Sequence, residues 1–226
     1  MRFVQHLLWN IKFQARYGFY LLYGLLTLLY TVLLINLPQF WKEGTAAILV
    51  FSDPAAMGLF FMGAIVLLEK SQRVTSLFAV SPLTAFEYVS SKVLSLSSIS
   101  LFVAMVLAVA SKCMSLPLVM LGTFLSSILF TLFGVIIATK ITSLNQFILA
   151  TVPIEIFTFG PAILHLFGIT PSFGRIYPTN VCMDLIAGRD FSILGMFFTV
   201  TLIVVMFFLA YRCVLKMWQE QGGARI

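Results

Sequence analysis

Residues 93–139 read VLSLSSISLFVAMVLAVASKCMSLPLVMLGTFLSSILFTLFGVIIAT and contain one charged side chain, that of Lys112. One apolar segment lies on each side of Lys112: residues 93–110 before it and residues 116–139 after it. Their lengths are close to the roughly 20 residues that a helix needs to cross the hydrocarbon core of a bilayer. Because backbone groups in lipid must be satisfied within the segment, both segments are predicted to be membrane-spanning helices.

The rest of the chain has the same character. Of the 226 residues, 61% are hydrophobic and 10% are charged, and the mean hydropathy is +1.05. Soluble domains carry about 25% charged residues. Four further apolar segments qualify as spans: residues 17–37, 46–68, 147–166 and 193–211. The sequence therefore predicts an all-α integral membrane protein with six spans in a single domain over residues 1–226. It has no basic run that would indicate a nucleic-acid partner.

Residues 2–16 are amphipathic at helical spacing. Apolar residues share one face and polar or basic residues share the other (Val4, Leu7, Leu8, Ile11 and Ala15 against Arg2, Gln5, His6, Lys12 and Arg16). Such a helix lies flat in the headgroup region of a membrane. We therefore expect an interfacial helix that leads into the first span. The alternative is an ordinary cytoplasmic extension of that span.

The distribution of basic residues predicts the orientation. If the N-terminus is cytoplasmic, six spans also leave the C-terminus inside. The outer segments then contain four of the fourteen Lys and Arg residues, and the inner segments contain the other ten (outer: Lys42, Lys112, Arg175 and Arg189). Basic residues collect on the cytoplasmic side of polytopic proteins. The sequence therefore predicts both termini inside.

The longest cytoplasmic connection runs from Glu69 to Lys92. Ser81-Pro82 is typical of a helix start, because serine caps helices and proline suits the first helical position. The expected helix, residues 81–89, would expose three apolar or aromatic side chains beside Glu87 (Leu83, Phe86 and Tyr88). An apolar surface exposed to cytosol indicates a partner protein. The alternative is that these side chains fold back onto the membrane interface, where aromatic residues also settle.

Glu155 is the clearest ionisable residue inside a predicted span. It lies about nine residues into the fifth span, roughly 13 Å deep at 1.5 Å per residue. Pro153 and Gly160-Pro161 flank it. Intramembrane carboxylates are costly and mark substrate or proton pathways. We expect Glu155 to face the transport cavity, the alternative being a buried group that hydrogen-bonds a neighbouring span.

Two other ionisable residues are weaker pathway candidates. Asp53-Pro54 has the signature of a helix start, which would make residues 45–52 a separate outer piece with Asp53 as the cap. A break at membrane depth would otherwise border protein or a wet cavity. His165 lies near the outer interface, where a structural role is the simpler interpretation.

Several of these pieces together resemble the permeases of type-2 ATP-binding-cassette exporters, and most of all the small permeases labelled fluoroquinolone exporters. The resemblance covers nearly the whole chain: the amphipathic N-terminal helix, six spans, a long first inner loop and a broken outer segment before the last span. It rests on Arg16-Tyr-Gly-Phe-Tyr20, Asp53-Pro54, Glu69-Lys70, Ser81-Pro82-Leu83, Glu87-Tyr88 and Lys92.

The resemblance implies that the long inner loop couples the permease to a separate ATPase subunit. The coupling residues would then be Glu69, Arg73, Ser81, Pro82, Leu83, Phe86, Glu87 and Tyr88. The chain has no Gly-x-x-x-x-Gly-Lys-Ser/Thr loop, so ATP and magnesium would bind the partner and not this chain. The resemblance also implies a second permease copy or a related permease, in the plasma membrane of a prokaryote. Drugs or small amphipathic molecules would be the cargo.

Two other classes of membrane protein remain as alternatives. A stand-alone secondary transporter or channel would favour inverted repeats or paired broken helices, and only the fifth span and the outer segment look broken. A membrane-embedded enzyme would need a catalytic set. The sequence shows no Gly-x-Ser-x-Gly motif, no acidic pair near histidines and no metal-ligand spacing of its cysteines.

Overall fold

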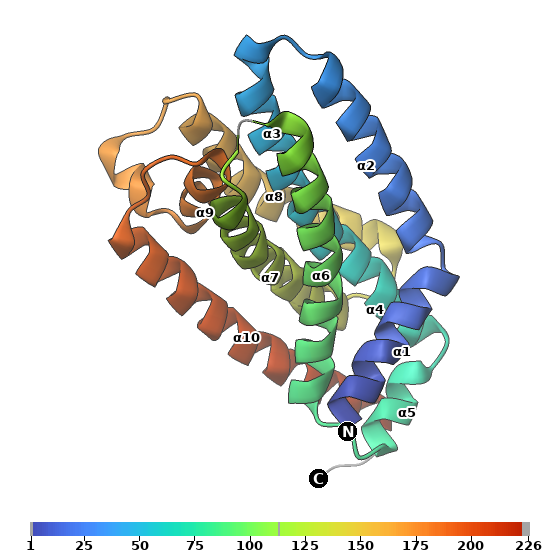
Figure 1. Cartoon of the computed structure of the whole chain (residues 1–226). Helices are drawn as coiled ribbons and strands as arrows, with labels where there is room; N and C mark the ends of the chain where they lie inside the picture. Colours follow the sequence, from blue (N-terminus) through green and yellow to red (C-terminus); the bar gives the residue numbers. More distant parts are fainter. Residues whose placement is uncertain (1, 113, 223–226) are drawn as a thin grey trace.

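The computed structural model describes residues 2–112 and 114–222, and its regular structure there is helical throughout (Figure 1). The elements are α1 (Arg2–Arg16), α2 (Phe19–Asn36), α3 (Gln39–Pro54), the π-helix η1 (Ala55–Phe61), α4 (Met62–Ser71), α5 (Val74–Val80), α6 (Ala85–Ser111), α7 (Leu116–Lys140), α8 (Leu144–Leu166), the 3-10 helix η2 (Ser172–Ile176), α9 (Pro178–Ala187) and α10 (Ile193–Gly222). Six stretches within these residues are long and apolar enough to cross a membrane. The prediction of an all-α integral membrane protein is confirmed.

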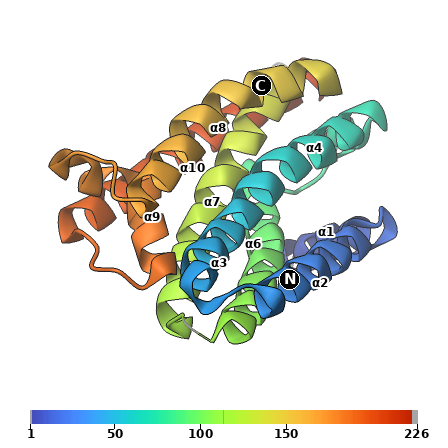
Figure 2. The ribbon, with the colours of Figure 1, turned by 90° about the horizontal axis from the view of Figure 1, so that it is seen from above.

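The bundle is built around α7. Helices α6, α10, η1, α9 and α4 all pack against it. In the most apolar part of α7, 61% of the residues are buried, against 11% in α2 and 17% in α10. Seen from above, α1 and α2 lie on one side of the bundle and α9 on the opposite side (Figure 2). The weakly buried helices α2 and α10 are therefore the surfaces that lipid or another protein can cover.

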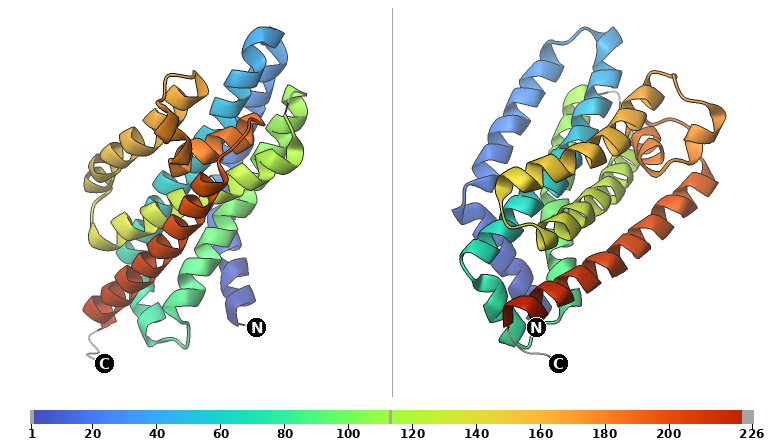
Figure 3. Two further views of the ribbon diagram at one scale, coloured as in Figure 1. Left: turned by 90° about the vertical axis from the view of Figure 1, so that its left-hand side faces the viewer. Right: turned by 180° about the vertical axis from the view of Figure 1, so that it is seen from behind.

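The two ends of the bundle differ. The start of α1, the short helix α5 and the end of α10 lie together at one end, and η2 and α9 lie at the other (Figures 1 and 3). This arrangement follows from the even number of spans. The α4–α6 connection and the α8–α10 connection are thus separated by the thickness of the membrane.

The second span is continuous, which contradicts the expected break at Asp53-Pro54. Helix α3 runs through Pro54 and continues directly into η1 and α4, so Asp53 does not cap a new helix. Proline removes one backbone donor and clashes with the preceding turn. The wider π-helical turns that follow Pro54 absorb this disturbance without ending the helix.

Close packing of α7 accompanies the π-helical segment. A Cβ atom added to Gly58 would lie 2.8 Å from the Thr131 backbone nitrogen, and one added to Gly134 would lie 2.8 Å from the carbonyl oxygens of Gly58 and Leu59. Glycine at both positions lets the two backbones meet, as small residues commonly do between helices in lipid.

Three helices extend beyond the predicted spans. The second span begins at Gln39 instead of residue 46, the third at Ala85 instead of Val93, and α10 continues to Gly222 instead of ending at Tyr211. Hydropathy shows where the lipid ends and not where the helix ends. The extension of α10 is held by packing, since Val214, Met217 and Trp218 are buried (α5 packs against α10).

Candidate functional site

The connection between α4 and α6 forms differently from the sequence expectation. Helix α5 occupies residues 74–80, and the next helix begins after Thr84, not at Ser81-Pro82. Thr84 Oγ1 accepts a hydrogen bond from the Glu87 backbone N–H at 3.2 Å, while the Thr84 N–H donates to Glu87 Oε2 at 2.9 Å. This reciprocal capping box is a stronger start signal than a lone Ser-Pro. No separate helix over residues 81–89 exists.

Ser81 closes the end of α5 instead of capping a new helix. Its backbone is extended, its hydroxyl donates to the Phe78 carbonyl at 2.9 Å, and its oxygen accepts from the Leu83 N–H at 3.3 Å. At the other end of α5, Arg73 is exposed and adopts a left-handed backbone with φ 56°. The connection is therefore a tight turn, a short helix and a second tight turn.

The exposed surface of this connection differs from the one expected. Tyr88 is fully buried and Leu83 is half-buried, so the prediction that both are exposed is wrong for Tyr88. Phe86 is exposed, although its ring lies 5.3 Å from that of Phe207 on α10. On α5, Leu77 is 65% exposed and Val80 is 75% exposed. We call Leu77, Val80 and Phe86 the inner apolar surface, because the sequence predicts that the connection between α4 and α6 is cytoplasmic.

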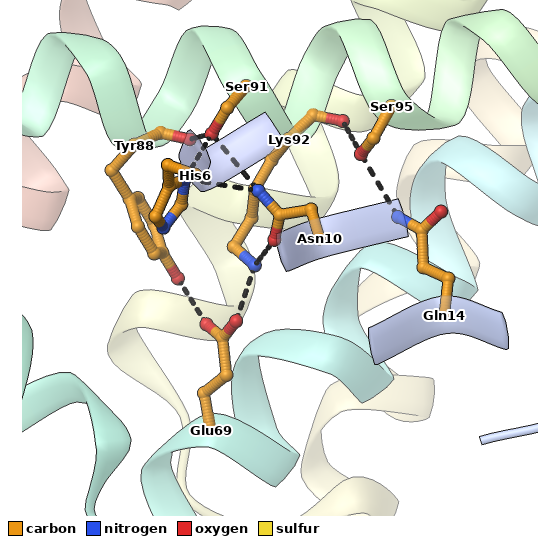
Figure 4. A network of polar contacts seen from close by, with 8 residues as sticks. All are labelled: His6, Asn10, Gln14, Glu69, Tyr88, Ser91, Lys92 and Ser95. Carbon is orange, nitrogen blue, oxygen red and sulfur yellow. Dashed lines mark hydrogen bonds and ion pairs between the residues drawn. The ribbon is translucent and has the colours of Figure 1, made fainter. Parts of the chain in front are cut away.

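A buried polar network joins α1, α4 and α6 (Figure 4). Lys92 Nζ of α6 lies 2.6 Å from Glu69 Oε1 of α4, and the Tyr88 hydroxyl donates to Glu69 Oε2 at 2.6 Å. Lys92 also donates to Asn10 Oδ1 of α1 at 3.1 Å. The side chains of Glu69 and Lys92 are 0% and 1% exposed. Three helices that are far apart in the sequence therefore meet at one ion pair.

Helix α1 completes the network with its polar face. His6 Nδ1 lies 2.6 Å from Ser91 Oγ, and Gln14 Nε2 donates to Ser95 Oγ at 3.0 Å. Burial, with the Lys92 charge as a smaller cause, lowers the pKa of His6 to about 4, so its ring is neutral near pH 7. The exposed Val4 and Leu8 lie on the opposite face. The predicted helix is thus present, but of its predicted polar face Gln5, Lys12 and Arg16 are exposed, and only His6 is buried against α6, together with Asn10 and Gln14.

Lys70 joins the neighbouring helix to this region. Its ammonium donates to the carbonyls of Ala138, Thr139 and Ile141 at 2.6, 2.8 and 2.9 Å. These carbonyls are at the end of α7, where a helix leaves acceptors unsatisfied and favours a cation. Glu69 and Lys70 therefore fix α4 to α6 and α7 respectively.

The three pathway candidates are not brought together by any hydrogen bond or ion pair among the described residues. Asp53 is 4% exposed inside the bundle, and Oδ2 has no hydrogen-bond partner in that part of the chain. Glu155 is half-buried on α8, on the same stripe as the buried Thr151 and Thr158. Its role in the pathway stays a prediction.

His165 is held at the end of the bundle that contains α9. Nε2 lies 3.0 Å from Asp184 Oδ2 of α9, and Nδ1 lies 2.6 Å from Thr170 Oγ1. The two ring nitrogens of His165 therefore connect α8 to α9 through Asp184 and to the following loop through Thr170. These contacts show how the ring is held, and the role of His165 in the pathway stays a prediction.

Sequence reasoning missed the partners of the motif residues. It singled out Glu69, Tyr88 and Lys92 without seeing that they meet, and it did not assign Asn10, Gln14 or Asp184 to a site. One signal was available: His6, Asn10 and Gln14 recur every four residues, and so do Ser91 and Ser95. Two polar stripes with the same spacing can pair along crossing helices.

The fold is that of a multi-pass membrane protein, and the buried polar network around Glu69 and Lys92 connects three of its helices near one end of the bundle. Residues 1–218 match the profile of the fluoroquinolones export permease protein family. The chain belongs to this family.

Two relatives that are similar in sequence carry the same family name. The fluoroquinolones export permease proteins of Mycobacterium tuberculosis strains CDC 1551 / Oshkosh and ATCC 25618 / H37Rv are each 30% identical to this chain over 149 residues. The match covers 64% of this chain and 62% of each relative, so the chain spans about three fifths of the length of the relatives it matches.

Proposed function

We propose that this permease is the membrane-spanning subunit of an ATP-binding-cassette exporter. A separate ATPase subunit would bind ATP and magnesium, and a second permease copy or a related permease would complete the complex. The observation that carries the proposal is the inner apolar surface backed by a fully buried ion pair. An exposed apolar surface indicates a partner, and the rigid joint behind it would carry that partner's movement into the membrane.

The coupling would work through short connections. Helix α5 is joined to α4 by the left-handed turn at Arg73 and to α6 by residues 81–84, and it also packs against α10. Movement of α5 would shift α4, α6 and α1 together, because Glu69 and Lys92 hold them at one point. Leu77, Val80, Pro82 and Phe86 would touch the ATPase, whereas Glu69, Ser81, Glu87 and Tyr88 would position the loop.

The name of the relatives supports fluoroquinolones as cargo. Glu155, half-buried on α8, is the candidate for contact with the cationic group of such a molecule, or for titration during transport. Of the three residues predicted from sequence, it is the one that remains accessible inside a span, since Asp53 is buried and His165 is held by Asp184.

Reconstituted vesicles test the proposed function against a secondary transporter. The permease, purified with its ATPase, is expected to move norfloxacin only when ATP is supplied on the ATPase side. Transport driven by a proton or sodium gradient without ATP would contradict the proposal. Glu155→Gln keeps the shape of the side chain and removes its charge, so this variant should assemble normally and lose transport. Full transport by Glu155→Gln would remove Glu155 from the pathway.

We also propose that the protein lies in the plasma membrane of a prokaryote with both termini inside. In a cysteine-free background, a cysteine at the exposed positions Gln72 or Gln219 should be protected from an impermeant thiol reagent in intact cells. A cysteine at Ser172, on the opposite end of the bundle, should be labelled. The reverse pattern would overturn the argument from basic residues.

A further inference from the structure

A cavity of about 810 Å³ opens at the outer end, between the end of α8, η2 and the end of α9. Its volume is typical of sites for small molecules. The polar side chains that line it include two cations, two carboxylates and the His165 ring: His165, Thr170, Arg175, Asp184, Arg189 and Asp190. No part of the coupling account uses this cavity.

The backbone at the end of α9 places two of these charged residues, Arg189 and Asp190, at the cavity. Gly188, with φ 67°, ends α9 in a left-handed conformation, which places Arg189 and Asp190 immediately after the helix. The Arg189 N–H donates to the Asp184 carbonyl at 2.8 Å, and its Nη1 donates to the Leu166 carbonyl at 2.8 Å. One wall of the cavity is therefore fixed by hydrogen bonds between α8 and α9.

The charges are of two kinds. Asp184 is held by His165, and Arg189 is anchored through Nη1. Arg175 of η2 and Asp190 are exposed, and neither makes a side-chain hydrogen bond or ion pair with the described residues. The cavity thus offers one free guanidinium and one free carboxylate on a rigid frame. The formal charges of the two arginines and the two aspartates balance.

We propose that this outer cavity binds zwitterionic molecules that carry one carboxylate or phosphate and one amine. The anionic group pairs with Arg175, since guanidinium donors match planar and tetrahedral oxyanions, and the amine pairs with Asp190. A purely anionic or purely cationic molecule leaves one of the two protein charges unmatched. The proposal deepens the proposed function by giving the exit side of the permease a class of cargo.

Two sources could supply this chemistry: a soluble zwitterion in transit, or the headgroup of phosphatidylethanolamine from the outer leaflet. Equilibrium binding to the purified permease in detergent distinguishes them. The probes are norfloxacin, its methyl ester, which is only cationic, its N-acetyl derivative, which is only anionic, and glycerophosphoethanolamine as the isolated headgroup. No ATPase is needed, so failure of this test is separate from failure of the ATP-driven mechanism.

Norfloxacin is expected to bind about three- to fivefold more tightly than either singly charged derivative, because each lost charged pair involves an exposed protein side chain and removes about that factor. Arg175→Gln should reduce norfloxacin to the affinity of the methyl ester and leave the ester unchanged. Asp190→Asn should reduce norfloxacin to the affinity of the N-acetyl derivative and leave that derivative unchanged. Tight binding of glycerophosphoethanolamine with the same crossed pattern, and none of norfloxacin, would assign the cavity to lipid headgroups.

Lys42→Gln and Glu43→Gln, at the outer start of α3 and away from the cavity, are the matched controls and should change nothing. Both cavity substitutions remove exposed side chains, so thermal unfolding in detergent should be unaltered. Equal affinity for all the probes, or an equal loss in the control variants, would overturn the proposal.

Discussion

Replacing Lys92 with methionine is expected to lower the free energy of unfolding of the permease by about 3–5 kcal/mol. The substitution keeps an unbranched side chain, one heavy atom shorter, and leaves the Glu69 carboxylate buried without its cation. Glu69 would retain the hydrogen bond from Tyr88, which lies 2.6 Å away, but no opposite charge. Asn10 Oδ1 would lose the donor that connects α1 to the pair. Unfolding of the purified variant in detergent measures the loss.

A double variant separates the charge from the shape. Glu69→Gln combined with Lys92→Met removes both charges and retains an acceptor for Tyr88. Because removal of a buried pair as a whole is far less costly than removal of one partner, most of the stability should return. Lys216→Met is the matched control: its ion pair with Glu220 is 3.8 Å long and largely exposed, so its loss should cost less than about 0.5 kcal/mol. If Lys92→Met is as stable as the parent, the ion pair does not join α4 to α6.

The second large effect is expected at α5. Leu77→Asp with Val80→Asp places two charges on the inner apolar surface without disturbing the core, since both side chains are mostly exposed. Truncation or disruption of central interface residues commonly costs 2 kcal/mol or more. We therefore expect retention of the ATPase to fall at least about tenfold, while thermal unfolding of the permease stays unchanged.

The structure also shows which substitutions would lower ATPase binding only indirectly, by disturbing the fold of the permease. Tyr88 is buried and hydrogen-bonded to Glu69, so a charge there would unfold the network and lower ATPase binding for a trivial reason. Phe86 contacts Phe207 of α10, so its loss would alter packing between two spans. Gln219→Asp, on the exposed part of α10, is the control for added charge.

The sequence predicted the spans well because the solvent sets them. Apolar length and the cost of unpaired backbone in lipid fix where helices cross, and the paired segments around Lys112 became α6 and α7. Helix ends were predicted poorly because hydropathy does not register them. The capping box of Thr84 and Glu87 was present in the sequence as Thr-x-x-Glu, but Ser81-Pro82 appeared to be the start.

The sequence identified several residues of the candidate site but not the contacts between them. Glu69, Tyr88 and Lys92 lie in the predicted coupling region, yet nothing local states that a tyrosine on α6 turns inward to a carboxylate on α4. That contact depends on how two helices cross. The expected break at Asp53-Pro54 failed for a related reason: Asp-Pro is typical of a helix start, whereas within this span the π-helical turns of η1 absorb the missing backbone donor and the helix stays continuous.

One measurement tests the central claim most directly. The tagged permease is purified from the membranes of its own host, and the proteins that co-purify with it in a stoichiometric ratio are identified. The account predicts that the parent and Gln219→Asp retain an ATPase with a phosphate-binding loop, and that Leu77→Asp with Val80→Asp loses it while remaining folded. Equal retention by the double variant would contradict the assignment of the inner apolar surface. A parent permease that transports without any such ATPase would contradict the whole account.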